Sequence, residues 1–263
     1  SRHLNDLQNQ LDKLTAKMNS SLPAEASAGI DAIQNLKEKN EIEGIYGTVY
    51  ELIKCPDELA VAASTVGKGQ LFYVVVENND VAVKVLNTLT NQKLGSATLL
   101  ALDTVNERNK PIEFPEAVTS LSSQLTYDRK FEKVINLVFG KTILAHSLEE
   151  ANELVEKYKM DVVTTDGDFF SAHGPITGGS RSHKHSPILI QSKIKHYQTE
   201  FEHAQEEYNR IKEERQQVKQ SIIDIQNRLD QAENENKEKE KEKFKVNMIA
   251  KPKLMDKQVD LIN

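Results

Sequence analysis

The sequence predicts an α/β (α+β) globule of two subdomains, flanked by two long helices with coiled-coil character. Hydrophobic residues make up 38% of the 263 residues, below the ~45–50% typical of a globular chain, so part of the chain is expected to lie outside a packed core. Near both ends, apolar residues recur at alternating spacings of three and four, which is typical of coiled-coil helices. Between these ends, short β-branched runs alternate with amphipathic segments, as in an α/β domain.

The first segment, 1–20, is predicted to be a coiled-coil helix. Its seam residues are Leu4, Leu7, Leu11, Leu14 and Met18. Pro23 ends this helix, because proline disfavours helical geometry in the residue before it. The connector, 21–43, is expected to hold a short second helix with one apolar face, formed by Ile30, Ile33 and Leu36.

The globule is predicted to span 44–182, with 44–108 as its first subdomain. Runs rich in β-branched and aromatic residues predict strands at 47–53, 71–76 and 97–102. An amphipathic helix is expected over 80–89, with Asp80 as its N-terminal cap. The polar segment 106–115 contains two prolines and is expected to separate the subdomains.

The second subdomain, 116–182, is expected to contain a helix over 131–139, a strand over 142–145, a helix over 147–158 and a strand over 162–165. Ser147 and Glu150 form the capping-box pattern that begins such a helix. Gly140 is predicted to end the preceding helix in a left-handed conformation. Asp166-Gly167-Asp168 is predicted to be a turn rather than a pair of reactive carboxylates, because Asp-Gly is a turn signal.

The C-terminal segment 187–233 is predicted to be the second coiled-coil helix, roughly 65 Å long at 1.5 Å per residue. Its heptad pattern has one polar interruption, Arg215. The charged segment 234–263 is expected to continue the coil or to form a joint in it, partly disordered. Its polar part, 234–243, is compatible with a solvated helix or with disorder, and Pro252 is expected to break the helix.

No catalytic, cofactor or metal site is predicted. Gly140-Lys141-Thr142 is not expected to bind phosphate, because a phosphate loop needs glycine where this chain has Ile135. His173, His183 and His185 lie near one another in sequence, but a zinc site usually needs about four ligands and Cys55 is the only thiol. The segment 182–185 is therefore expected to be a solvated loop, with adventitious metal binding as the alternative.

Composition excludes other classes. Cys55 is the only cysteine, so no internal disulfide can form. The longest apolar run, 71–76, is far shorter than the ~20 residues of a membrane helix. The net charge of −6 argues against a uniformly basic surface that binds nucleic acid.

A modest basic cluster is nevertheless present where the globule meets the C-terminal helix. Its members are Arg181, Lys184, Lys193 and Lys195. Such residues contact DNA phosphates, and lysines near a helix N-terminus do not stabilise the helix dipole. The cluster is therefore a candidate DNA-binding site, with ordinary surface charge as the alternative.

Three glycines, Gly174, Gly178 and Gly179, lie close together around Ile176 and Thr177. They indicate backbone that must be bare, either for positive φ or for the close approach of another chain. A flexible linker is the alternative, but Ile176 and Thr177 are β-formers and poor linker residues.

The architecture and five short motifs resemble the hinge of structural maintenance of chromosomes (SMC) proteins. The motifs are Gly44-Ile45-Tyr46-Gly47, Leu71-Phe72-Tyr73-Val74-Val75-Val76, Val138-Phe139-Gly140-Lys141-Thr142, Asp166-Gly167-Asp168 and Ile176-Thr177-Gly178-Gly179. They occur in the order and approximate spacing of the family and cover about 44–180. Within the family, the stretches 125–133 and 160–164 are most similar to the third-type SMC subunit of cohesin.

The resemblance implies an SMC-hinge-like globule whose flanking helices form an antiparallel coiled coil. It implies the dimerisation hinge of a chromosome-organising ATPase, nuclear and chromosome-associated, that acts in sister chromatid cohesion and chromosome segregation. ATP and Mg²⁺ would bind in head domains outside this chain, so the fragment is expected to be neither an enzyme nor a cofactor carrier.

The resemblance also implies partners and a contact site. The partner would be another SMC hinge, in a heterodimer in the cell and a potential homodimer in isolation, with DNA as a second candidate and neither a membrane nor a small-molecule substrate. The hinge–hinge contact, where strand edges from two subunits pair, would involve Gly174, Ile176, Thr177, Gly178 and Gly179. The alternative is an unrelated coiled-coil scaffold that forms parallel homodimers.

Overall fold

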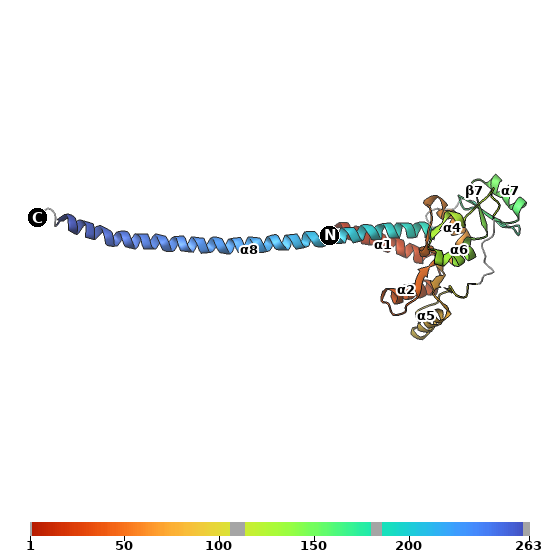
Figure 1. Cartoon of the computed structure of the whole chain (residues 1–263), viewed down its shortest axis with the longest axis horizontal. Helices are drawn as coiled ribbons and strands as arrows, with labels where there is room; N and C mark the ends of the chain where they lie inside the picture. Colours follow the sequence, from red (N-terminus) through yellow and green to blue (C-terminus); the bar gives the residue numbers. More distant parts are fainter. Residues whose placement is uncertain (1, 106–113, 180–185, 260–263) are drawn as a thin grey trace. The chain divides into compact units, whose positions relative to one another are not determined.

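The computed structural model of the chain describes residues 2–105, 114–179 and 186–259, with side chains described up to residue 248. The chain divides into two compact units (Figure 1). Arg2–Phe201 contains every described strand and all the helices that precede α8 (Pro187–Val259). The other unit contains Glu202–Asn263, and its described part is the distal portion of α8.

Two helices precede the sheets, as predicted. Helix α1 (Arg2–Asn19) buries Leu7, Leu11 and Met18, and α2 (Ala24–Glu38) follows after Pro23. Helix α1 ends where the globule begins, whereas α8 begins where the globule ends. The first turns of α8 therefore run antiparallel to α1, beside which they lie in Figure 1. Both helices contribute to one core, with Leu11 and Met18 from α1 and Ile188, Ile190 and Ile194 from α8.

The first sheet has the order β1-β3-β4, with β1 (Ile45–Thr48) antiparallel and β4 (Leu99–Ala101) parallel to β3 (Val74–Val76). Helix α5 (Asn79–Gln92) packs on β3 and β4. The helix expected over 80–89 is confirmed, but its cap is Asn78 and not Asp80, because the Asn78 side chain accepts a hydrogen bond from the Val81 N–H (3.0 Å).

The single strand predicted over 47–53 is wrong. Strand β1 gives way to a helical turn, α3 (Val49–Leu52), before β2 (Ile53–Lys54). The cause is the Glu51 side chain, which reaches back so that its Oε2 accepts a hydrogen bond from the Thr48 N–H (2.7 Å), as in one half of a capping box. This hydrogen bond favours a turn in residues whose side chains resemble those of a strand.

The buried strand predicted over 71–76 is only half correct. Its first residues belong to a 3₁₀ segment, η2 (Lys68–Phe72), closed by a hydrogen bond from the Tyr73 N–H to the Gln70 carbonyl (3.2 Å). Before it lie η1 (Asp57–Leu59) and α4 (Ala60–Gly67).

The second sheet has the order β10-β9-β8-β7-β5. Its strands are β5 (Thr119–Ser120), β7 (Thr142–Ala145), β8 (Asp161–Thr164), β9 (Phe169–Phe170) and β10 (Ile176–Thr177). Helix α7 (Leu148–Tyr158) crosses between the parallel strands β7 and β8. Its predicted cap is confirmed, because Ser147 Oγ accepts from the Glu150 N–H (3.1 Å).

Shorter elements connect the sheets. Strand β2 pairs with β6 (Thr126–Tyr127), and η4 (Ser122–Gln124) and η5 (Arg129–Phe131) lead into α6 (Glu132–Phe139). Residues from both halves, including Val75 and Phe139, share one core. The left-handed conformation predicted for Gly140 is wrong, since its φ is −71°. Glycine is needed there for space, because a Cβ would lie 2.5 Å from the Asn136 carbonyl oxygen.

Helix α8 continues through 234–243 and through Pro252 to Val259, so the predicted break at Pro252 is wrong. Glu and Lys have high helix propensity, which favours a solvated helix over disorder in 234–243. Proline removes one backbone hydrogen bond, and the Lys, Ala, Leu and Met residues on either side are good helix formers. Within the described ranges, no helix is both long and apolar enough to cross a membrane.

Candidate dimerisation site

Strand β10 is at one end of its sheet and pairs on one side only, with β9. Its register places Ile176 opposite Phe170 and Thr177 opposite Phe169. The Ser171 N–H donates to the Pro175 carbonyl (2.9 Å). Because hydrogen-bonded and non-hydrogen-bonded pairs alternate in an antiparallel ladder, the Ile176 N–H and C=O point away from β9. The predicted contact strand therefore presents an open edge, and the Ile176 side chain is 63% exposed.

The predicted glycines serve different purposes. Gly174 and Gly179 have φ of 109° and 113°, and a Cβ at either would meet nothing within 4 Å. These two residues are needed for their backbone conformation. At Gly178 a Cβ would collide with the carboxylate of Asp168, so this glycine accommodates the close approach of its own chain.

Asp168 holds the glycine stretch in place, a role that sequence reasoning missed. Its Oδ1 accepts a hydrogen bond from the Gly179 N–H (2.9 Å). The turn predicted over 166–168 is confirmed, because the Gly167 N–H donates to the Thr164 carbonyl (2.9 Å) with φ at +90° for Gly167. In the sequence, this role could have been inferred only from the position of the Asp168 carboxylate at the end of the predicted turn.

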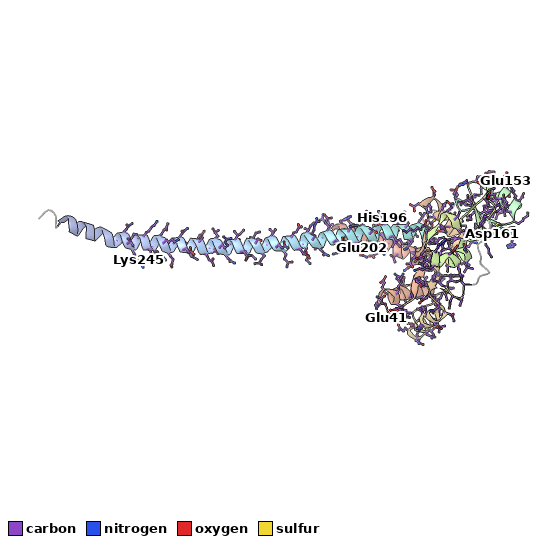
Figure 2. All side chains as sticks on the ribbon, viewed as in Figure 1. Glu41, Glu153, Asp161, His196, Glu202 and Lys245 are labelled. Carbon is purple, nitrogen blue, oxygen red and sulfur yellow. The ribbon has the colours of Figure 1, made fainter. Side chains whose placement is uncertain are left out.

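Asp161 is a second anchor that sequence reasoning missed. Figure 2 labels this residue at the start of β8. Its Oδ1 accepts hydrogen bonds from the Ala172 N–H (2.8 Å) and the Ser171 hydroxyl (3.3 Å). Asp161 thus holds the turn of the β9–β10 hairpin, and Asp168 holds its open end, after β10.

A groove of ≈ 270 Å³ lies beside β10. Its lining residues come from α7 and the residue that follows it, from β9 and β10, and from the turn between these strands: Asn152, Val155, Glu156, Lys159, Phe170, Ser171, Ala172, Gly174 and Ile176. The Ile176 side chain therefore lies on the face of the sheet that α7 covers. The groove leaves that side chain accessible to a second chain.

The first sheet has its own open edge at β4, which sequence reasoning did not identify as an edge. The Val74 N–H donates to the Thr98 carbonyl (2.9 Å), and the Leu102 N–H donates to the Val76 carbonyl (3.0 Å). Thr98 and Leu102 therefore face β3. Alternation along the strand directs the Leu99 N–H and C=O outward.

The predicted basic cluster is only partly described. Arg181 and Lys184 lie outside the described residues. Lys193 and Lys195 are exposed on α8, and at about 100° per residue they point in different directions. The Lys195 ammonium donates to the Glu51 carbonyl (3.1 Å), so this lysine is held against the globule.

Other reactive groups do not converge on a site in the described residues. Among these residues, no group of three His, Cys, Asp or Glu side chains is placed to hold a metal ion. Burial, with a smaller contribution from the Asp57 carboxylate, raises the pKa of the Cys55 thiol to about 12. Cys55 is therefore a poor nucleophile at neutral pH, because the thiolate is the reactive form.

Comparison with known proteins identifies relatives of the chain. The family described as SMC proteins Flexible Hinge Domain matches residues 42–155. The chromosome segregation protein sudA of Emericella nidulans is 30% identical over 194 residues, which cover 73% of this chain and 16% of that protein. Structural maintenance of chromosomes protein 3 of Dictyostelium discoideum is 27% identical over 238 residues, which cover 89% of this chain and 16% of that protein. The chain thus spans about a sixth of the length of these relatives.

Solved structures show the same fold. The hinge domain of Geobacillus stearothermophilus SMC, an asymmetric dimer, is 25% identical with a TM-score of 0.53, over 80% of this chain and 89% of that one. The Pyrococcus furiosus Smc hinge with an extended coiled coil is 26% identical with a TM-score of 0.50, over 89% and 87% of the two chains. Both the sheets and the flanking helices therefore have counterparts in SMC hinges, and the chain belongs to the SMC hinge family, with structural maintenance of chromosomes protein 3 among its similar relatives.

Proposed function

We propose that this chain is the dimerisation hinge of a cohesin-like SMC protein that acts in sister chromatid cohesion and chromosome segregation. The open edge of β10 is the observation that carries the proposal. An exposed strand edge with unpaired backbone groups is a template for another strand. The contact residues proposed are Gly174, Ile176, Thr177, Gly178 and Gly179.

The edge at β4 supplies the complement to β10. We propose that β10 of one hinge pairs with β4 of a second hinge. A two-fold axis repeats this contact, so the assembly closes with two such pairings. Pairing of β10 with β10 would instead create one contact between strands of two residues each, which is too small to hold two proteins together.

The proposed partner is another SMC hinge, in a heterodimer in the cell and a homodimer in isolation. ATP and Mg²⁺ would bind in head domains outside this chain. The protein is proposed to be nuclear and chromosome-associated, in keeping with relatives named for chromosome segregation and chromosome maintenance.

Proline at position 176 tests the proposed edge. Ile176→Pro removes the outward N–H of β10 but none of the hydrogen bonds to β9, because Ile176 and Phe170 are a non-hydrogen-bonded pair. We expect a folded chain with half the mass of the dimer in sedimentation, and Ile176→Val should remain dimeric because it keeps the N–H. A folded Ile176→Pro variant with full dimer mass would contradict the proposal.

The alternative function, a scaffold with parallel coiled coils, makes a different prediction. Crosslinks between Leu11 and α8 within one chain support the antiparallel hinge. Crosslinks found only between identical positions of different chains would favour the parallel scaffold.

DNA contact is proposed as a second property, carried by the exposed Lys193 together with Arg181, Lys184 and Lys195. Binding through phosphates should be independent of sequence and fall steeply with salt. Changing all four residues to Glu should abolish binding without altering dimer mass. Unchanged DNA binding by that variant would assign the contact elsewhere.

A further inference from the structure

Helix α2 contacts the first sheet at both of its edges. Near the C-terminal end of the helix, the Lys37 ammonium donates a hydrogen bond to the Tyr46 carbonyl of β1 (2.7 Å). Near the N-terminal end, the Glu25 carbonyl accepts a hydrogen bond from the Ser96 N–H (2.9 Å), three residues before β4 begins. Because the sheet order is β1-β3-β4, one helix holds the backbone at both edges of the sheet.

The contact of α2 with the segment before β4 has a consequence for association. We infer that α2 positions the edge strand β4 for contact with a second chain, and that Gly29 and Gly95 are the residues through which it does so. They are positioning residues, since they act through the backbone that leads into β4. The inference rests on the proposed dimerisation, in which β4 is a contact strand, and adds the element that sets where this strand begins.

Gly29 permits the close approach from the side of the helix. It is buried inside α2, where glycine is destabilising relative to alanine. A Cβ at Gly29 would collide with the backbone carbonyl of Ser96. The colliding atoms belong to the backbone, so the rotation of a side chain cannot relieve the contact. Glycine at this position therefore serves the approach of the segment that leads into β4.

Gly95 permits the same approach from the side of that segment. Its φ is +101°, a conformation that residues with a Cβ rarely adopt. A Cβ at Gly95 would collide with the Glu25 carbonyl and would lie 2.7 Å from the Gly29 nitrogen. The two glycines, far apart in sequence, thus let α2 and the segment before β4 meet backbone to backbone.

Helix α2 is itself fixed on the sheet. Ile33 and Leu36 are buried in the core that α2 shares with α5 and all three strands, and Leu99 packs against this core. Strand β3 holds β4 from the side, because the Val74 N–H donates to the Thr98 carbonyl (2.9 Å). The contact with α2 therefore determines the path of the backbone just before β4, where the open edge begins.

Association through this edge depends on that path. Hydrogen bonds between strands need donor–acceptor distances of ~2.7–3.2 Å, so a displacement of roughly 1 Å at the start of β4 removes the first contacts with a partner strand. Displacement of residues 95–96 should therefore weaken association while the sheet itself stays intact.

Gly29→Ala tests the inference. The added methyl group should push residues 95–96 away from α2. We expect the dissociation constant of the dimer, measured by sedimentation at several concentrations of the full chain, to rise roughly tenfold, which corresponds to about 1.4 kcal/mol. Gly69→Ala is the matched control, because it adds the same methyl group where nothing lies within 4 Å, and it should leave the dissociation constant unchanged.

Amide hydrogen exchange separates a change of position from a general loss of structure. In Gly29→Ala the Ser96 N–H should lose its protection, whereas the Val74 N–H should remain protected by the Thr98 carbonyl. That result would place β4 in its sheet with only the approach to it moved.

Lys37→Met is a second variant, which introduces no collision with Ser96. It removes the hydrogen bond to the Tyr46 carbonyl at the far end of α2 and keeps an apolar stem of similar length. We expect it to raise the dissociation constant by a smaller factor than Gly29→Ala does. If Gly29→Ala does not fold, unchanged association of Lys37→Met overturns the inference.

The remaining outcomes separate this inference from the proposed dimerisation. A folded Gly29→Ala chain that associates like the parent would overturn the role of α2 and leave dimerisation intact. Weaker association together with lost protection of the Val74 N–H would also overturn it, because the effect would then be general unfolding. A parent chain that stays monomeric when concentrated would overturn the proposed homodimer, and the positioning role with it.

Discussion

Ser186 connects the coiled-coil arm to the globule through one buried hydroxyl. Its Oγ accepts from the Leu189 N–H (3.3 Å), which caps α8, and donates to the Ala60 carbonyl (3.1 Å) on α4. The hydroxyl of Ser64 lies 2.6 Å from it and supplies a further hydrogen bond. Ser186 therefore caps α8 and at the same time links α8 to α4.

We expect Ser186→Ala to lower the free energy of unfolding by about 2 kcal/mol, because it removes a cap and leaves buried partners unpaired. Ser147→Ala is the matched control, since Ser147 caps α7 through the Glu150 N–H (3.1 Å) in exposed surroundings. The control should lose about 1 kcal/mol. Urea unfolding measures both losses, and equal values would show that Ser186 acts only as a cap.

Substitutions of the glycines that follow β10 are expected to affect both association and stability. Gly178→Glu combined with Gly179→Glu should prevent dimerisation, because burying an unpaired charge costs several kcal/mol. The same change places a side chain against the Asp168 carboxylate and imposes a positive φ on glutamate. We therefore expect reduced stability as well as a monomer, measured by thermal unfolding and sedimentation, whereas Ile176→Pro should affect association more selectively.

Two weakly acidic side chains, the buried Tyr50 and the half-buried Cys55, make the fold sensitive to alkali. The pKa rises from 9.0 to about 12 for Cys55 and from 10.0 to about 12 for Tyr50, in both cases mainly by burial. Above pH 9 the unfolded chain loses protons that the folded chain keeps, so the unfolded state binds fewer protons and stability falls as pH rises. This contribution is fully present below pH 9 and lost progressively toward about pH 12.

Urea midpoints measured across this pH range test the prediction. The midpoint should begin to fall near pH 9 in the parent chain and only near pH 10 in Cys55→Ala, in which Tyr50 remains. Identical pH profiles for the two chains would contradict the role of Cys55.

At the scale of elements, α8 extends well beyond its partner helix. Helix α1 has 18 residues and α8 has 73. In the distal unit, large apolar side chains are exposed: Tyr208, Ile211, Val218, Ile222, Ile225 and Leu229. Such a stripe is typical of a helix that packs against another chain segment.

Removing the chain after residue 215 should leave the cooperative unfolding of the globule unchanged. In the part of α8 whose side chains are described, Ile194 is the last buried residue, well before residue 215. Thermal unfolding followed by circular dichroism checks the result, with loss of helix signal but the same midpoint for the globule. Unfolding of the globule on this truncation would show that the distal coil stabilises it.

At the scale of the whole molecule, the two halves of the globule depend on one another. The polar segment 106–115 predicts a boundary, but Val75 from one half and Phe139 from the other lie in the same core. A sequence boundary reports local composition, whereas a core forms between segments that are distant along the chain. The hinge is therefore expected to unfold as one unit.

Local patterns by themselves determined the helical seams, the cap at Ser147 and the turn at Asp166-Gly167-Asp168, whereas the strand edge at Ile176 was expected from the family resemblance. These features depend on neighbouring residues, whose periodicity and hydrogen-bonding groups are visible in the sequence. The same reasoning was wrong over 47–53, because the hydrogen bond from the Thr48 N–H to the Glu51 side chain favours a turn over the strand that β propensity predicts.

Only the tertiary structure decided which strand edges stay open and which glycines face their own chain. Leu99 and Ile176 lie far apart in sequence, in separate sheets, and the direction of their backbone groups follows from the strands beside them. Gly178 is bare because Asp168 approaches it, a contact created by folding of the hairpin. Periodicity identifies a strand, but the hydrogen bonds left over for a partner are known only when every strand has found its neighbours.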